Sequence, residues 1–167
     1  MKTTKLLLIL LLISNLSFSQ FKRFGYGENE YLTMSISIDP TATIKESSPN
    51  LVFEIELVSY WGYIKATTQI LPGLEGSYLD YGGAVGLNFQ SGYTQETRWY
   101  VGGRAVVVNR GGFKYPLFGT EAGVDTMVTN SLFIGLRTTL DDRTDFEFWG
   151  GQNKLVLSGF VRIGIKF

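Results

Sequence analysis

Glu54 and Glu56 are the residues of this chain whose type and spacing most directly suggest chemistry. In an extended segment, side chains two positions apart share one face, and two neighbouring carboxylates can serve as a general acid and a general base. The alternative is that both carboxylates are counterions for arginine and lysine side chains. We favour the second interpretation, so we predict no catalytic residue and no enzymatic activity.

The composition of the 167-residue chain supports that prediction, because it contains neither cysteine nor histidine. Thiolate metal sites and cysteine nucleophiles are therefore excluded. The commonest general base and metal ligand is also missing. Lysine plus arginine equal aspartate plus glutamate at 15 each, so no basic excess attracts nucleic acid. We predict no cofactor, no metal and no nucleic-acid partner.

A second acidic group lies near aromatic residues towards the end of the chain. It consists of Asp141, Asp142, Asp145 and Glu147, beside Phe146, Phe148 and Trp149. These acids could bind a cation or contribute to a partner surface. The alternative, which we favour, is that residues 146–149 continue a hairpin and the acids are solvated.

The elements that position these side chains are predicted to be β-strands, because apolar residues alternate with polar or small ones from Tyr31 onward. Eight such segments follow one another, at about 31–38, 51–60, 63–71, 78–90, 98–109, 115–128, 131–140 and 155–167. Strands of about nine to eleven residues match a tilted bilayer crossing. The predicted fold is all-β: an eight-stranded antiparallel up-and-down transmembrane β-barrel.

The two faces of these strands differ in charge. One face is nearly free of charge, and the other carries a balanced set that we predict to form an ion-pair network in the lumen. The set is Glu54, Glu56, Lys65, Asp80, Arg104, Glu121, Asp125, Arg137, Arg162 and Lys166. A membrane barrel places its polar face inside, whereas a soluble lipocalin-like carrier places charges outside. We favour the membrane barrel and keep the soluble periplasmic carrier as an alternative.

Aromatic residues on the apolar faces lie near strand ends that would share one side of the barrel. Trp61, Phe89 and Trp99 are the examples within the chain. Aromatic rings of this kind prefer the interface between lipid and water. We therefore predict that these three side chains mark a membrane interface.

The first residues have the pattern of a secretory signal peptide. Lys2 and Lys5 precede an apolar run over residues 6–13, and Ser17 and Ser19 provide small side chains before Gln20. A transmembrane anchor is the alternative, but it needs about 20 apolar residues. We predict a signal peptide over residues 1–19 and a barrel domain over residues 20–167.

The last strand carries alternating apolar residues, Val161, Ile163 and Ile165, followed by Phe167. This pattern resembles the terminal signal of bacterial outer-membrane β-barrel proteins, which the barrel-assembly machinery recognises. The barrel pattern as a whole resembles the small eight-stranded barrels of the OmpA membrane-domain and OmpX type, and the cleavage region resembles those of Bacteroidetes envelope proteins. The resemblance implies contact with outer-membrane lipid, periplasmic termini and external loops.

Two functions remain open at this point. One is a structural or interaction protein that presents loops, with residues 39–50 and 141–154 as possible partner surfaces. The other is a narrow channel for ions or small solutes. The small enzymes of the outer membrane resemble one another in using histidine, so the resemblance does not favour an enzyme.

Overall fold

The computed structural model describes residues 30–91, 96–149 and 154–167. The predicted signal peptide lies outside the described residues. Residues Tyr31–Phe167 make up one compact unit. None of the helices in the described part of the chain has both the length and the apolar character needed to cross a membrane.

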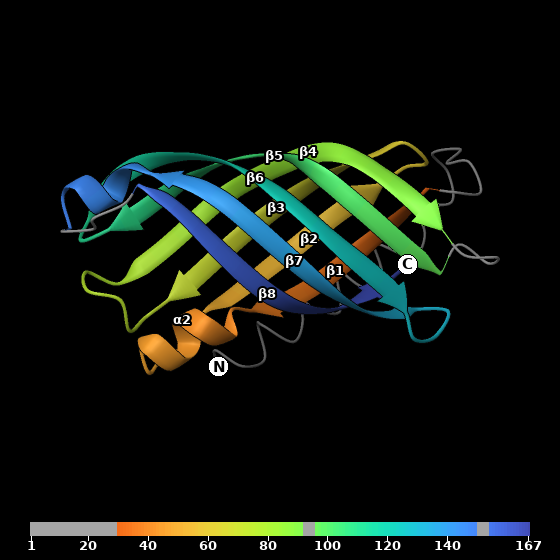
Figure 1. Cartoon of the computed structure of the whole chain (residues 1–167), viewed down its shortest axis with the longest axis horizontal. Coiled ribbons are helices and arrows are strands. Elements are labelled where there is room, and N and C mark those ends of the chain that lie inside the picture. Colours follow the sequence, from red (N-terminus) through yellow and green to blue (C-terminus); the bar gives the residue numbers. More distant parts are fainter. Residues whose placement is uncertain (1–29, 92–95, 150–153) are drawn as a thin grey trace, which may run out of the picture. The chain divides into compact units, whose positions relative to one another are not determined.

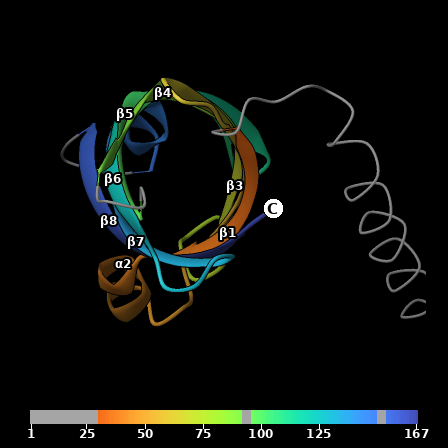
Figure 2. The same ribbon diagram turned by 90° about the vertical axis from the view of Figure 1, so that its right-hand side faces the viewer.

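This unit is a closed barrel of eight antiparallel strands in sequence order (Figure 1). Each strand pairs with the next, and β8 returns to β1, so the barrel forms a ring when seen from one end (Figure 2). The predicted fold class is thereby confirmed. The strands are β1 (Tyr31–Ile38), β2 (Leu51–Val58), β3 (Gly62–Leu71), β4 (Tyr78–Ser91), β5 (Thr97–Arg110), β6 (Phe113–Met127), β7 (Leu132–Arg143) and β8 (Leu155–Lys166).

Two loops at one end of the barrel differ from the prediction. The segment 39–50 contains a helix, α2 (Pro40–Lys45), which begins where the Asp39 carboxylate accepts a hydrogen bond from the Ala42 amide at 2.9 Å. Strand β7 extends to Arg143, so Asp141 and Asp142 belong to a strand and not to a loop. A 3₁₀-helix, η2 (Thr144–Glu147), follows directly.

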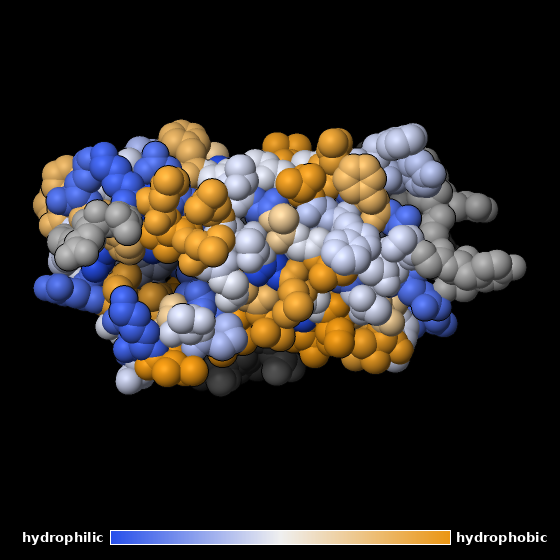
Figure 3. All heavy atoms as spheres, in the orientation of Figure 1, coloured by the Kyte–Doolittle hydropathy of each residue, from blue (hydrophilic) through white to orange (hydrophobic). Residues whose placement is uncertain are grey.

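The outer wall of the barrel is apolar. Among the outward-facing positions of the eight strands, Lys114 and Asp142 are the charged ones, and both lie near the end that carries α2 and η2. We call this the loop end, and the opposite end the turn end. On the face drawn in Figure 3, hydrophobic patches and residues of intermediate hydropathy cover most of the strands, and the larger strongly hydrophilic areas lie towards the two ends. This distribution is the reverse of a soluble lipocalin.

The closing contact between β1 and β8 is short. Residues 33–38 of β1 pair with residues 161–166 of β8, so residues 155–160 of β8 have no partner strand on that side. Helix α2 lies outside the wall and packs against β8 (Figure 2). The wall is therefore completed by a helix, not by a strand, at the loop end of this contact.

Gly82 allows β4 and β5 to approach closely. A Cβ at this position would overlap with the carbonyl oxygen of Ala105, whereas a Cβ at Gly103 would meet nothing within 4 Å. We expect Gly82→Ala to lower the free energy of unfolding by about 1–3 kcal/mol, because overpacking forces the backbone to shift. Gly103→Ala is the matched control, and its urea midpoint in detergent micelles should stay near wild type. Equal midpoints for the two variants would contradict the close approach.

Candidate functional site

The barrel interior is filled by an equal number of acidic and basic side chains. In the described residues, seven acids and seven bases form ion pairs there, and none of these side chains is more than 11% exposed. The acids are Glu54, Glu56, Asp80, Glu121, Asp125, Asp141 and Asp145, and the bases are Lys65, Arg98, Arg104, Arg110, Arg137, Arg143 and Arg162. The formal charges of these side chains therefore balance one another.

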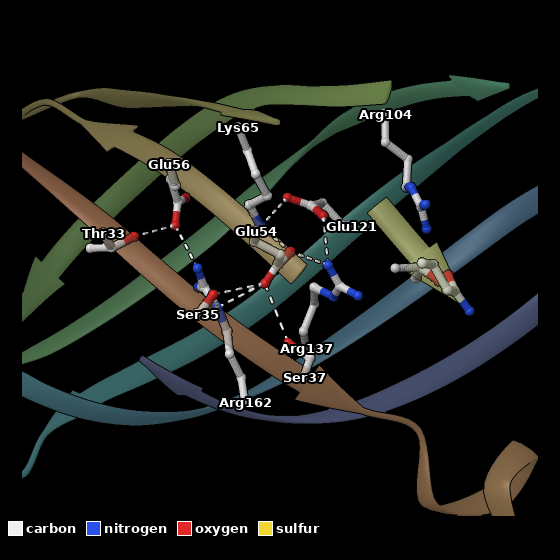
Figure 4. Close-up of polar contacts among 12 residues, drawn as sticks. Thr33, Ser35, Ser37, Glu54, Glu56, Lys65, Arg104, Glu121, Arg137 and Arg162 are labelled. Atoms are coloured by element: carbon white, nitrogen blue, oxygen red, sulfur yellow. Dashed lines mark hydrogen bonds and ion pairs between the residues drawn. The ribbon is translucent and has the colours of Figure 1, made fainter. Parts of the chain in front are cut away.

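Arg162 lies at the centre of the larger group, which contains Glu54, Glu56, Glu121, Asp125, Lys65, Arg98, Arg137 and Arg162. Figure 4 shows Glu54, Glu56, Glu121, Lys65, Arg137 and Arg162 of this group. Its Nε lies 2.9 Å from Glu54 Oε2. Its Nη2 lies 2.8 Å from Glu56 Oε2, and its Nη1 lies 2.7 Å from Asp125 Oδ2. One guanidinium therefore links three carboxylates from β2 and β6.

The surroundings of Glu54 explain why the two glutamates are counterions. Glu54 forms ion pairs with Arg137 and, at 3.3 Å, with Lys65, in addition to Arg162. The Ser35 hydroxyl also donates a hydrogen bond to it at 3.1 Å. A fully buried carboxylate surrounded by three cations has no access to a substrate, so this arrangement does not support acid–base catalysis at Glu54 and Glu56.

Aromatic rings fill the space beside the arginines. Arg137 lies 4.3 Å from the centroid of the Phe160 ring, and Arg162 lies 5.0 Å from that of Phe133. Arg98 lies 4.8 Å from the centroid of Tyr100. A cation held over a ring is stabilised by the ring's negative face, and the flat rings exclude water from the ion pairs.

A second group occupies the lumen nearer the loop end. Arg104 forms ion pairs with Asp141 at 2.9 Å and with Asp80 at 3.7 Å. Tyr78 donates a hydrogen bond to Asp80 at 2.7 Å, and its ring lies 4.4 Å below the Arg143 guanidinium. Tyr78 thereby connects this group to the one that closes the loop end.

Asp145 of η2 closes that end. It is fully buried and accepts hydrogen bonds from Arg143 at 2.9 and 2.6 Å and from Arg110 at 3.1 Å. The prediction that the acids of this segment are solvated is therefore wrong for Asp141 and Asp145. It holds for Asp142, which is exposed, and for Glu147, which is exposed and forms a surface ion pair with Lys154. In the described residues no acids are grouped to hold a metal ion, so the cation site is not supported.

The ring of Trp149 ties three loops together above Asp145. It packs against Gly76 in the β3–β4 loop and Gly111 in the β5–β6 turn, both of which have positive φ angles. The Gly111 amide donates to the Gly76 carbonyl oxygen at 2.8 Å, and Arg110 lies 4.8 Å from the Trp149 ring centroid. The loop end is therefore a single packed surface.

The structure brings together nine of the ten residues predicted for the network, and Lys166 is the exception. Lys166 is half-buried, its Nζ lies 4.1 Å from the Tyr31 ring centroid, and it takes part in none of the ion pairs found in the described residues. It lies at the turn end of β8, beyond the acids of the lumen.

Sequence reasoning missed five members of the network: Arg98, Arg110, Asp141, Arg143 and Asp145. A signal existed for Arg98 and Arg110, because both share the even-numbered face of β5 with Arg104. No sequence signal placed Asp145, because its burial depends on η2 folding back over the lumen.

The remaining predicted site residues lie on the outer wall. Trp61, Phe89 and Trp99 are 74%, 59% and 53% exposed at the turn end, where Phe89 is opposite Trp99 in the β4–β5 register. Val161, Ile163, Ile165 and Phe167 face outward on or just after β8, between 47% and 53% exposed. These positions are compatible with the predicted membrane interface and assembly signal, both of which stay predictions.

The chain has the fold of the small transmembrane β-barrels. No protein-family model matches it, and no curated protein does. It is similar to a de novo designed transmembrane β-barrel, with a TM-score of 0.57 and 12% identity over 85% of this chain and 99% of that one. It is also similar to the Yersinia pestis outer membrane protein Ail, with a TM-score of 0.51 and 9% identity over 83% and 99%. Neisserial surface protein A matches with a TM-score of 0.46 and 12% identity over 82% of this chain and 95% of that one.

Proposed function

We propose that the mature chain is a non-enzymatic protein of the bacterial outer membrane, with a lumen sealed by ion pairs and loops that serve a structural or interaction role. The observation that carries this proposal is the burial of the lumen charges. Glu56, Asp80 and Arg162 are at most 1% exposed, although an open water channel would leave its lining exposed. The apolar outer wall supports the membrane location.

Buried apolar clusters between the ion pairs also support a closed lumen. One consists of Leu71, Tyr78, Val106, Val108 and Leu117, between the levels of Arg104 and Arg110 on β5. The other consists of Val58, Tyr63, Ala84 and Tyr100, beside the larger group of ion pairs. An ion crossing the barrel would have to displace both clusters and break the ion pairs around them.

The loops 39–50 and 141–154 are the surfaces through which we propose contact with a partner, with the correction that the second begins after β7, at Thr144. Ile44 is 79% exposed and Phe148 is 72% exposed at this end. The ties made by Trp149 and Arg110 hold the underlying surface in one conformation, which reduces the entropy lost on binding.

We also propose the remaining steps of export and assembly. The signal peptide over residues 1–19 would direct secretion, and the outward residues of β8 with Phe167 would engage the barrel-assembly machinery. Their support is the sequence pattern, together with the outward exposure of Val161, Ile163 and Ile165.

Planar-bilayer recording tests the sealed lumen against the channel. Purified, refolded mature protein should give no stable unitary conductance, because the side chains of the ion-pair network are at most 11% exposed. The same sample is run on a gel with and without boiling, and a heat-dependent mobility shift verifies that the barrel is folded. Reproducible unitary steps from a sample that passes this control would favour the channel.

A further inference from the structure

A groove of about 700 Å³ crosses the outer wall over β5, β6, β7 and β8. Its course follows the strand register, because Ala122 is opposite Thr138, which is in turn opposite Gly159. Phe89 and Trp99 line one end, and Pro40 and Thr41 at the start of α2 line the other. The groove therefore runs across the strands, from the aromatic residues of the turn end to the helix of the loop end.

Large side chains border the groove on both sides. Leu136 and Val161 project from the turn-end side and are 59% and 49% exposed. Leu140 and Leu157, which face each other in the β7–β8 register, lie four residues further along the same strands towards the loop end. The floor is lower because Ala122 and Gly159 contribute little or no side chain. The groove is thus a recess in the outer wall, away from Lys114 and Asp142, the charged outward positions of the strands.

The α2 end of the groove borders the unpaired edge of β8. Residues 155–160 have no partner on β1, and in the described residues α2 makes no backbone hydrogen bond to them. On this side of β8, alternate backbone N–H and C=O groups of residues 155–160 therefore point within the sheet towards α2, with no partner strand. Hydrocarbon cannot satisfy such groups, so a polar group is required next to them.

We propose that this groove binds one acyl chain of a phospholipid along its length, with the ester and phosphate oxygens at the α2 end. These oxygens accept hydrogen bonds from the free N–H groups of β8. From β4 to β8 the groove spans about 19 Å at the usual strand spacing, comparable to an extended long acyl chain. The site is continuous with the outer wall, which lipid would cover in a membrane. The inference therefore rests on the proposed membrane location, and it adds one defined lipid-binding site on that wall.

Two substitutions fill the groove, and each has a matched control. Gly159→Leu and Ala122→Leu place a large side chain on the floor. A Cβ at Gly159 meets nothing within 4 Å, so the change should not disturb the wall. Gly103→Leu and Ala105→Leu make the same changes at exposed, outward positions of β5 that do not line the groove.

The test is lipid retention. Wild-type and variant mature proteins are reconstituted in dioleoylphosphatidylcholine nanodiscs and released into detergent, and bound lipid is counted by native mass spectrometry. Wild type and both controls should retain one phospholipid per barrel. In Gly159→Leu and Ala122→Leu the occupied fraction should fall by about tenfold, since the filled groove has no room for a chain.

Three results would overturn the proposal. Wild type could retain no lipid, the groove variants could retain as much as their controls, or wild type could form a dimer that the groove variants abolish. The last result would mean that a second copy occupies the groove. Heat-dependent gel mobility distinguishes failure of the lipid site from failure of the proposed membrane barrel. If the wild-type protein shows no mobility shift, both proposals are overturned. If it shows the shift but retains no lipid, only the lipid site is overturned.

Discussion

Arg162→Met is expected to lower the free energy of unfolding by about 3–5 kcal/mol, because removing one partner of a buried ion pair leaves uncompensated charge. Three carboxylates, Glu54, Glu56 and Asp125, would lose a guanidinium that lies within 2.9 Å of each. Methionine retains most of the side-chain volume, so the effect reports charge and not a cavity. Urea unfolding of the refolded barrel, followed by the heat-sensitive gel band, measures it.

Lys166→Met is the matched control, because it makes the same kind of change on the same face of β8. Lys166 contacts the Tyr31 ring, and its loss should cost less than about 1 kcal/mol. If Arg162→Met does not refold, a second substitution tests the same idea. Adding Glu56→Gln should partly restore refolding, because it removes one of the uncompensated acids. Equal midpoints for wild type and Arg162→Met would contradict the network.

Asp145→Ala is expected to open the loop end. Arg110 and Arg143 would then face each other with no carboxylate between them, at a cost of about 3 kcal/mol for a buried pair. The change should raise the population in which η2 is detached, and trypsin should then cleave after Arg143. Cleavage is followed on the folded barrel in detergent, where the strands themselves resist the protease.

Asp142→Ala is the control for this experiment, because Asp142 is three residues away and exposed. Its cleavage rate should match wild type, since a solvated acid contributes little to stability. The same cleavage rate in both variants would mean that Asp145 does not hold the loop end closed.

The strands and their two faces could be predicted from the amino-acid sequence alone. Apolar and polar residues alternate with a period of two in the sequence, and side chains alternate between the two faces of a β-strand with the same period. The predicted strand from Tyr31 to Ile38 therefore agrees with β1 in its bounds. The same alternation separated the charged face, which includes Glu54 and Arg137, from the apolar face. These properties are local, and each strand carries its own evidence for them.

The sequence did not predict the members of the ion-pair network that lie beyond the predicted strands. The alternating segment that predicts a strand over about 131–140 ends at Leu140, so the sequence predicts a loop that begins at Asp141. Its burial follows from the pairing of β7 with β6, which places Asp141 opposite Gly119 and within reach of Arg104. Helix α2 was missed because six residues give too short a pattern to detect.

The pairing of each acid with a particular base depends on the tertiary structure. Glu56 and Arg162 are 106 residues apart in the sequence, and Ser35 and Arg162 are 127 apart, yet each pair is in contact inside the lumen. Such pairs depend on the closure of β1 with β8 and on the stagger that accumulates around the ring, which a repeat of two residues within a strand does not encode. The unpaired edge of β8 and the groove beside it arise from the same closure, because β1 ends at Ile38 while β8 continues to Leu155.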